Sequence, residues 1–230
     1  MHNFLQESVF LGVILSLAAY GIGTMLKKRF KMSIFNPLLI AVVITIVVLS
    51  GLNLDYKTYY EGAKYISYLL TPATVCLAIP LYEQIEMLKK YKTAIVIGIC
   101  SGVLTSLLSI FVLCLLFGLD HKQYVTLLPK SITTAIGMGV SEELGGYVTI
   151  TVAVIVITGV FGNMIASTVC KIFRIEEPVA RGIAIGSSSH AIGTVKAMEM
   201  GEIEGAMSSL SIAVAGVLTV VAASLFAEFL

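Results

Sequence analysis

The chain has 230 residues, of which 57% are hydrophobic and only 13% are charged, and its mean hydropathy is +0.96. Soluble domains are about 45–50% apolar and about 25% charged, so a soluble fold could not cover this apolar surface. The composition therefore predicts one all-α membrane domain over residues 1–230. The 15 basic and 14 acidic residues nearly balance, which gives no charge-based reason to expect a nucleic-acid partner.

Charged residues divide the sequence into apolar runs that are long enough to cross a bilayer. A spanning helix needs about 20 residues, and six charge-free runs approach or exceed that length. They cover residues 8–26, 32–54, 65–82, 93–119, 144–170 and 205–227. The run at 65–82 contains Pro72 and Pro80. Because proline removes a backbone donor and kinks a helix, this run is also a candidate for a broken helix.

Two further stretches are shorter and more polar. Residues 123–141 and 182–198 are rich in glycine, serine and threonine, and Lys130 and Lys196 interrupt them. Their sequences predict broken or re-entrant helices rather than simple spans.

Basic residues are expected to concentrate on the inner side of a membrane, which favours one topology. If the six runs span, the polar stretches re-enter and the N-terminus lies outside, eleven of the 15 basic residues lie inside. The remaining four are Lys57, Lys64, Lys122 and Lys130. We therefore expect about six full spans plus two or three broken or re-entrant segments. Eight crossings, with the broken helices counted, stay an alternative.

The two polar stretches resemble each other. Residues 131–145 and 187–201 share six of fifteen residues at a fixed offset of 56 positions, and a long apolar run follows each. An odd number of spans between the copies would invert one relative to the other. Residues 120–170 and 176–227 are thus candidate inverted-repeat units, an architecture of secondary transporters. Chance similarity of small residues is the alternative.

Polar side chains in these stretches are candidates for an anion site. A broken helix exposes backbone N–H groups, and neighbouring hydroxyls add donors that suit a carboxylate. The candidate substrate-binding residues are Thr74, Lys130, Thr133, Thr134, Ser188, Ser189, His190 and Lys196. The candidates for coupling to a proton or another ion are Glu143, His190 and Glu199. Helix packing, a buried structural histidine and lysines that reach the interface are the alternatives.

No catalytic or cofactor motif accompanies these residues. The four cysteines lie in or beside apolar runs without ligand spacing, so neither a metal site nor a disulfide is expected. Ser189, His190 and Glu199 offer a nucleophile, a base and an acid, but adjacent side chains rarely face each other. We expect a protein that is not an enzyme.

At its longest motifs, the chain resembles the LrgB/CidB family of bacterial membrane proteins. These motifs are NPLL at 36–39, LTPATVCLAIPLYEQ at 70–84, LPKSITTAIGMGVSEELGG at 128–146, GVFGN at 159–163 and SSSHAIGTVKAMEMGEIEGAMSSL at 187–210. The resemblance implies a multi-pass protein of the bacterial plasma membrane. It also implies a separate LrgA/CidA-like companion, because only the LrgB-like part is present here. A homo-oligomer is possible.

The resemblance implies two kinds of function. Some relatives are described as carriers of small monocarboxylates, with pyruvate, glycolate and glycerate as substrates. The repeat and the carboxylate-suited donors favour this hypothesis for the present chain. The alternative is a holin/antiholin-like protein that modulates murein hydrolase activity and lysis. The substrate, the coupling ion and the LrgB or CidB subtype stay open.

Overall fold

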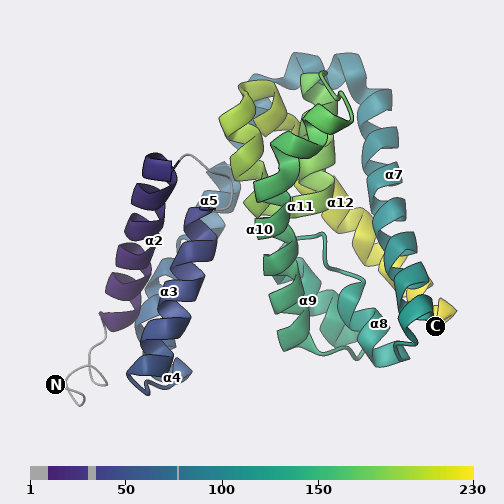
Figure 1. Ribbon diagram of the computed structural model, residues 1–230. Coiled ribbons are helices and arrows are strands. Elements are labelled where there is room, and N and C mark those ends of the chain that lie inside the picture. Colours follow the sequence, from purple (N-terminus) through teal and green to yellow (C-terminus); the bar gives the residue numbers. More distant parts are fainter. Residues whose placement is uncertain (1–9, 31–34, 77) are drawn as a thin grey trace. The chain divides into compact units, whose positions relative to one another are not determined.

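The computed structural model describes residues 10–30, 35–76 and 78–230, and every regular element in these ranges is a helix (Figure 1). The expected all-α fold is confirmed for this part of the chain. The chain forms two compact units, Met1–Cys76 and Leu77–Leu230. The single membrane domain expected over residues 1–230 stays a prediction.

The first unit contains α2 (Leu11–Phe30), α3 (Pro37–Gly51), α4 (Tyr56–Ser67) and α5 (Leu70–Cys76). Helix α2 packs against α3 and α4. Gly12 and Gly23 permit this approach, because a Cβ at either position would collide with the backbone of Tyr59 or Pro37. The Ser16 hydroxyl lies 2.8 Å from the Tyr59 hydroxyl and so joins α2 to α4.

Helix α3 is shorter than the predicted span at 32–54. The Asn36 side chain accepts hydrogen bonds from the N–H groups of Leu38 and Leu39, and Pro37 occupies the first turn. Both features define a helix start, because they satisfy or remove backbone donors. Its 15 residues extend about 22 Å, which is less than the hydrocarbon core thickness of about 30 Å. The cap thus explains why α3 differs from the prediction.

Four described helices are long and apolar enough to cross a membrane: Leu11–Phe30, Ile85–Phe117, Val148–Ile172 and Glu202–Phe229. They coincide with four of the six predicted spans. In the run at 65–82, α4 ends at Ser67 and α5 begins at Leu70, two residues before Pro72. Helix α6 (Ala78–Glu83) holds Pro80, and residue 77, between α5 and α6, lies outside the described residues. The total number of crossings stays a prediction.

The second unit carries the remaining helices. They are α6, α7 (Ile85–Phe117), α8 (His121–Leu127), α9 (Thr134–Glu143), α10 (Val148–Ile172), α11 (Pro178–Met200), α12 (Glu202–Phe226) and the short 3₁₀ helix η1 (Ala227–Phe229). Helix α11 packs against α7, α10 and α12. This central position gives α11 its role in the site described below.

Both polar stretches contain a break in the helix. The first lies between α8 and α9, over residues 128–133, and the second lies within α11 at His190, where φ is 41° and ψ is −144°. A half-helix follows each break, then a connection that contains Gly145 or Gly201, and then a helix of 25 residues. These two glycines are separated by the 56-residue offset of the sequence repeat. The inversion of the two copies stays a prediction.

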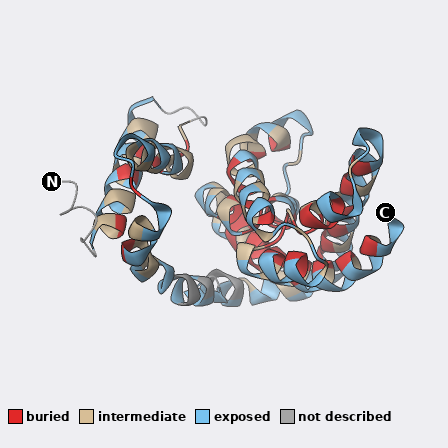
Figure 2. Cartoon of the chain, turned by 90° about the horizontal axis from the view of Figure 1, so that it is seen from below, coloured by how far each residue is buried: buried red, intermediate tan, exposed pale blue. Residues whose placement is uncertain are grey.

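Close packing of α11 on α12 produces much of the interior of the second unit. A Cβ at Gly182 would meet the Glu204 carbonyl oxygen, and one at Gly186 would collide with the Ser208 carbonyl oxygen. Small residues allow helices to approach closely where no hydrophobic effect drives them together. Buried residues accordingly gather where the helices of this unit face one another (Figure 2).

We expect Gly186→Ala to destabilise the protein by about 1–3 kcal/mol, because the added methyl group overpacks the α11–α12 contact. The midpoint of thermal unfolding in detergent should fall by several degrees. Gly139→Ala is the matched control, since a Cβ there meets nothing within 4 Å. This change should leave stability unchanged or raise it by up to about 1 kcal/mol. Equal midpoints for the two variants would contradict the packing argument.

Candidate functional site

Lys130 lies in the break between α8 and α9. Its side chain is half-buried, and its Nζ donates a hydrogen bond to Ser131 Oγ at 2.8 Å. Ser131 Oγ lies 3.1 Å from Ser106 Oγ of α7. None of the ion pairs found among the described residues includes Lys130. The break therefore presents a cation that forms no ion pair within the described part of the chain.

A cavity of about 780 Å³ lies between α7 and the first half of α11, and Lys130 lines it. We call this space the hydroxyl-lined cavity. Its hydroxyl groups belong to Tyr91, Ser101, Thr105, Ser106, Ser109, Ser131, Ser187 and Ser188. Glu177 also lines it. A concave site with one cation and many hydroxyl donors can bind an anion that carries hydrogen-bond acceptors.

Several of these hydroxyls currently bond to the carbonyl of the preceding helical turn. Ser188 Oγ donates to the Ala184 carbonyl oxygen at 2.6 Å, and Ser187 Oγ donates to that of Ile183 at 2.7 Å. Those carbonyls lie in a continuous helical segment, where they also accept backbone N–H groups. A hydroxyl can therefore rotate towards a ligand without leaving its carbonyl partner unsatisfied.

A second cavity of about 510 Å³ lies between α10 and α11, and it also reaches Lys130. We call it the apolar cavity. Lys130, Ala184 and Ser188 line both cavities, whereas Ser189 lines only the apolar one. Ser189 is buried against Gly162, where any Cβ would collide with its hydroxyl. The structure thus brings together three predicted site residues, Lys130, Ser188 and Ser189.

His190 is the break in α11, and its ring is buried. The Nε2 atom lies 3.0 Å from the Ile155 carbonyl oxygen of α10, and the ring packs against Gly159. Thr194 Oγ1 donates to the His190 carbonyl oxygen at 3.0 Å. The residue lines neither cavity. Its contacts are those of a side chain that fixes the bend of α11.

Other predicted residues lie outside both linings. Thr133 and Thr134 begin α9 but line neither cavity. Glu143 is exposed at the end of α9. Helix α5 contains Thr74, but the surroundings of its side chain lie outside the described residues.

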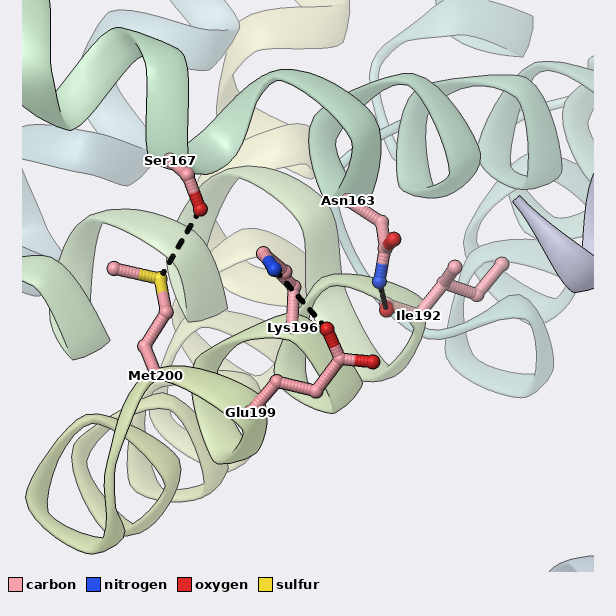
Figure 3. A network of polar contacts seen from close by, with 6 residues as sticks. All are labelled: Asn163, Ser167, Ile192, Lys196, Glu199 and Met200. Atoms are coloured by element: carbon pink, nitrogen blue, oxygen red, sulfur yellow. Dashed lines mark hydrogen bonds and ion pairs between the residues drawn. The ribbon is translucent and has the colours of Figure 1, made fainter. Parts of the chain in front are cut away.

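Lys196 and Glu199 form a partly exposed ion pair with 3.0 Å between Nζ and Oε2 (Figure 3). In the same view, Asn163 Nδ2 of α10 donates to the Ile192 carbonyl oxygen at 2.9 Å. Lys196 lines neither cavity. The two lysines that interrupt the polar stretches therefore have different surroundings.

Sequence reasoning missed two polar features. The hydroxyls of α7 recur at Ser101, Thr105 and Ser109 within the run 93–119, and this helical spacing was the available signal. Arg181 Nη1 lies 3.6 Å from Oε1 of buried Glu204, which links the starts of α11 and α12. No spacing rule predicts that pair. Among the described residues, no cluster of three or more His, Cys, Asp or Glu could hold a metal ion.

These features define a helical membrane protein that has, in its described part, four helices apolar enough to cross a bilayer and a cation at a helix break. The model of the LrgB-like family matches residues 16–229. The chain is 40% identical over 222 residues to proteins called antiholin-like protein LrgB from Bacillus cereus (strain B4264) and Bacillus anthracis (strain CDC 684 / NRRL 3495), and 96% of each chain is covered. The chain therefore belongs to the LrgB-like family. No solved structure matches it.

The backbone of His190 gives a prediction with an unusual sign. At φ 41°, an L-residue costs about 1–3 kcal/mol, whereas glycine adopts positive φ freely. We expect His190→Gly to be more stable than His190→Ala, although alanine is the better helix former by about 1 kcal/mol. Thermal unfolding in detergent measures the order. Both variants lose the ring, so a more stable alanine variant would show that the bend has straightened.

Proposed function

We propose that this protein is a secondary carrier of small monocarboxylates, of the pyruvate, glycolate or glycerate type, that works with an LrgA/CidA-like companion in the bacterial plasma membrane. The observation that carries the proposal is Lys130, a half-buried cation at a helix break that faces a hydroxyl-lined cavity. Ionisable residues inside membrane segments are costly and are retained mainly for function.

The single positive charge of Lys130 favours a substrate with one negative charge. One lysine neutralises one carboxylate, whereas a dicarboxylate would carry a second buried charge without a partner, at a cost of several kcal/mol. The hydroxyls of Ser106, Ser131 and Ser188 would donate hydrogen bonds to the keto oxygen of a keto acid. With a hydroxy acid, they could donate to its hydroxy group or accept from it. The proposal requires no covalent chemistry, so it keeps the expectation that the protein is not an enzyme.

Alternating access would use the bend in α11. Its first half lines both cavities and ends at His190, where the helix is already broken. In carriers that are built from interrupted helices, one repeat usually rocks against the other around a fixed site, and the first half of α11 would belong to that fixed site. The coupling candidates Glu143, His190 and Glu199 line neither cavity, so any role in proton or ion coupling would be indirect.

Lys130→Gln should reduce saturable uptake of labelled pyruvate or glycolate into proteoliposomes by more than about tenfold, because a carboxylate would lose its only counter-charge. The vesicles contain the companion protein. Lys196→Gln is the matched control and should retain uptake, since its ammonium group lies outside both cavities and pairs with Glu199. Normal uptake by Lys130→Gln, or no saturable uptake by the unmodified protein, would refute the proposal.

A second candidate function is control of murein hydrolase activity and lysis. It is favoured by the name antiholin-like protein LrgB, which the Bacillus relatives carry. In this case no single-substrate site is needed. In a bacterial host that lacks its own LrgB-like protein, Lys130→Gln should then restore hydrolase activity and lysis rate as well as the unmodified chain. Loss of both phenotypes together with uptake would instead make lysis control a consequence of transport.

A further inference from the structure

Two cavities reach the same lysine, and one of them has more hydroxyl groups in its lining than the other. The hydroxyl-lined cavity runs along α7, and the apolar cavity runs along α10, with the first half of α11 contributing to both. Lys130, Ala184 and Ser188 are their shared lining. An anion at Lys130 could thus extend a substituent into either space.

The apolar cavity has the shape of a groove along one face of α10. Its lining recurs at helical spacing from Ile157 through Phe161 and Ile165 to Val169. Twelve residue steps of an α-helix correspond to about 18 Å. Its volume of about 510 Å³ lies within the range of small-molecule sites. The polar groups in its lining are few, and they include Lys130, Ser188 and Ser189.

An apolar groove that reaches a cation and three hydroxyls complements an amphiphile with a single negative head. A neutral lipid chain would fill the groove but would leave the Lys130 charge uncompensated. A small hydroxy acid would satisfy the lysine but leave the groove empty of hydrocarbon. A monocarboxylate with an aliphatic chain satisfies both parts at once.

We propose that the apolar cavity is a second arm of the anion site that accepts the hydrocarbon chain of aliphatic monocarboxylates. The carboxylate binds Lys130 and Ser188, and the chain lies along α10. This inference rests on the proposed carrier function, because it uses the same lysine. It extends the substrate class from small keto and hydroxy acids, which use the hydroxyl-lined cavity, to acids with longer alkyl chains.

The test is a binding series with acetate, butyrate, hexanoate and octanoate. The full chain is placed in nanodiscs of zwitterionic lipid, and binding is measured by titration calorimetry. Each methylene group that enters the groove should tighten binding by about fourfold, the factor expected for burial of one CH₂. Hexanoate should bind at least about tenfold more tightly than acetate. An affinity that does not change with chain length overturns the inference.

Two variants separate the groove from the anion site. Ile165→Phe and Val169→Phe each fill part of the groove, so the ratio of octanoate affinity to acetate affinity should fall towards one. Ile150→Phe is the control, because Ile150 lies exposed on α10 and lines neither cavity. Thermal unfolding identifies any variant that does not fold. If one of the two filling variants fails to fold, the affinity ratio of the other one tests the inference. An unchanged ratio in a folded filling variant overturns the inference.

Removal of charge, from the protein or from the ligand, distinguishes binding at the site from partition of the acids into lipid. Lys130→Gln should weaken the binding of every acid by at least about tenfold at each chain length, and hexanol and octanol should bind more weakly than hexanoate and octanoate by a similar factor. An unchanged acid affinity in this variant, or equal affinities of an alcohol and the acid of the same chain length, shows a groove for any apolar chain and overturns the inference. If pyruvate uptake is normal but the affinity of the acids does not change with chain length, only the proposed role of the apolar cavity is overturned. Absence of both pyruvate uptake and binding of every acid overturns the carrier function as well.

Discussion

A helix that breaks among apolar surroundings must find partners for the backbone groups that it frees, because no water is present to bind them. The second unit supplies these partners from side chains. At the break in α11, Thr194 donates to the His190 carbonyl, and Asn163 of α10 donates to that of Ile192. The bend is therefore held by a neighbouring helix as well as by its own sequence, and the first half of α11 keeps a fixed direction.

The break between α8 and α9 is satisfied in the same way. Thr151 Oγ1 of α10 lies 2.9 Å from the Thr126 carbonyl oxygen and 2.7 Å from Ser141 Oγ. The Thr126 hydroxyl accepts the Tyr147 N–H. These bonds hold α8, α9 and α10 together around the break that carries Lys130. The cation is costly in this setting, and its position depends on a hydrogen-bond network that binds no ligand itself.

Several features could be read from the sequence, because they depend on composition and local spacing. Low charge and high hydropathy indicated the membrane, and the polar stretches marked both helix breaks. The motifs indicated the family that the comparison then confirmed. Other expectations concerned lengths and contacts. Residues 32–54 predicted a full span, but the Asn36 cap starts a helix of only 15 residues. Thr133 and Thr134 were expected to donate to a substrate, yet they line neither cavity.

The sequence by itself thus determined an all-helical membrane protein of the LrgB-like family and the places where its helices break. Tertiary structure alone decided which lysine faces a cavity. Lys196 finds a carboxylate three residues away on its own helix, whereas Lys130 meets Ser131 in the break and shares its cavities with α7, α10 and α11. In the sequence, both lysines interrupt short polar stretches. Their surroundings differ because charge pairing and burial depend on residues that are distant in the sequence.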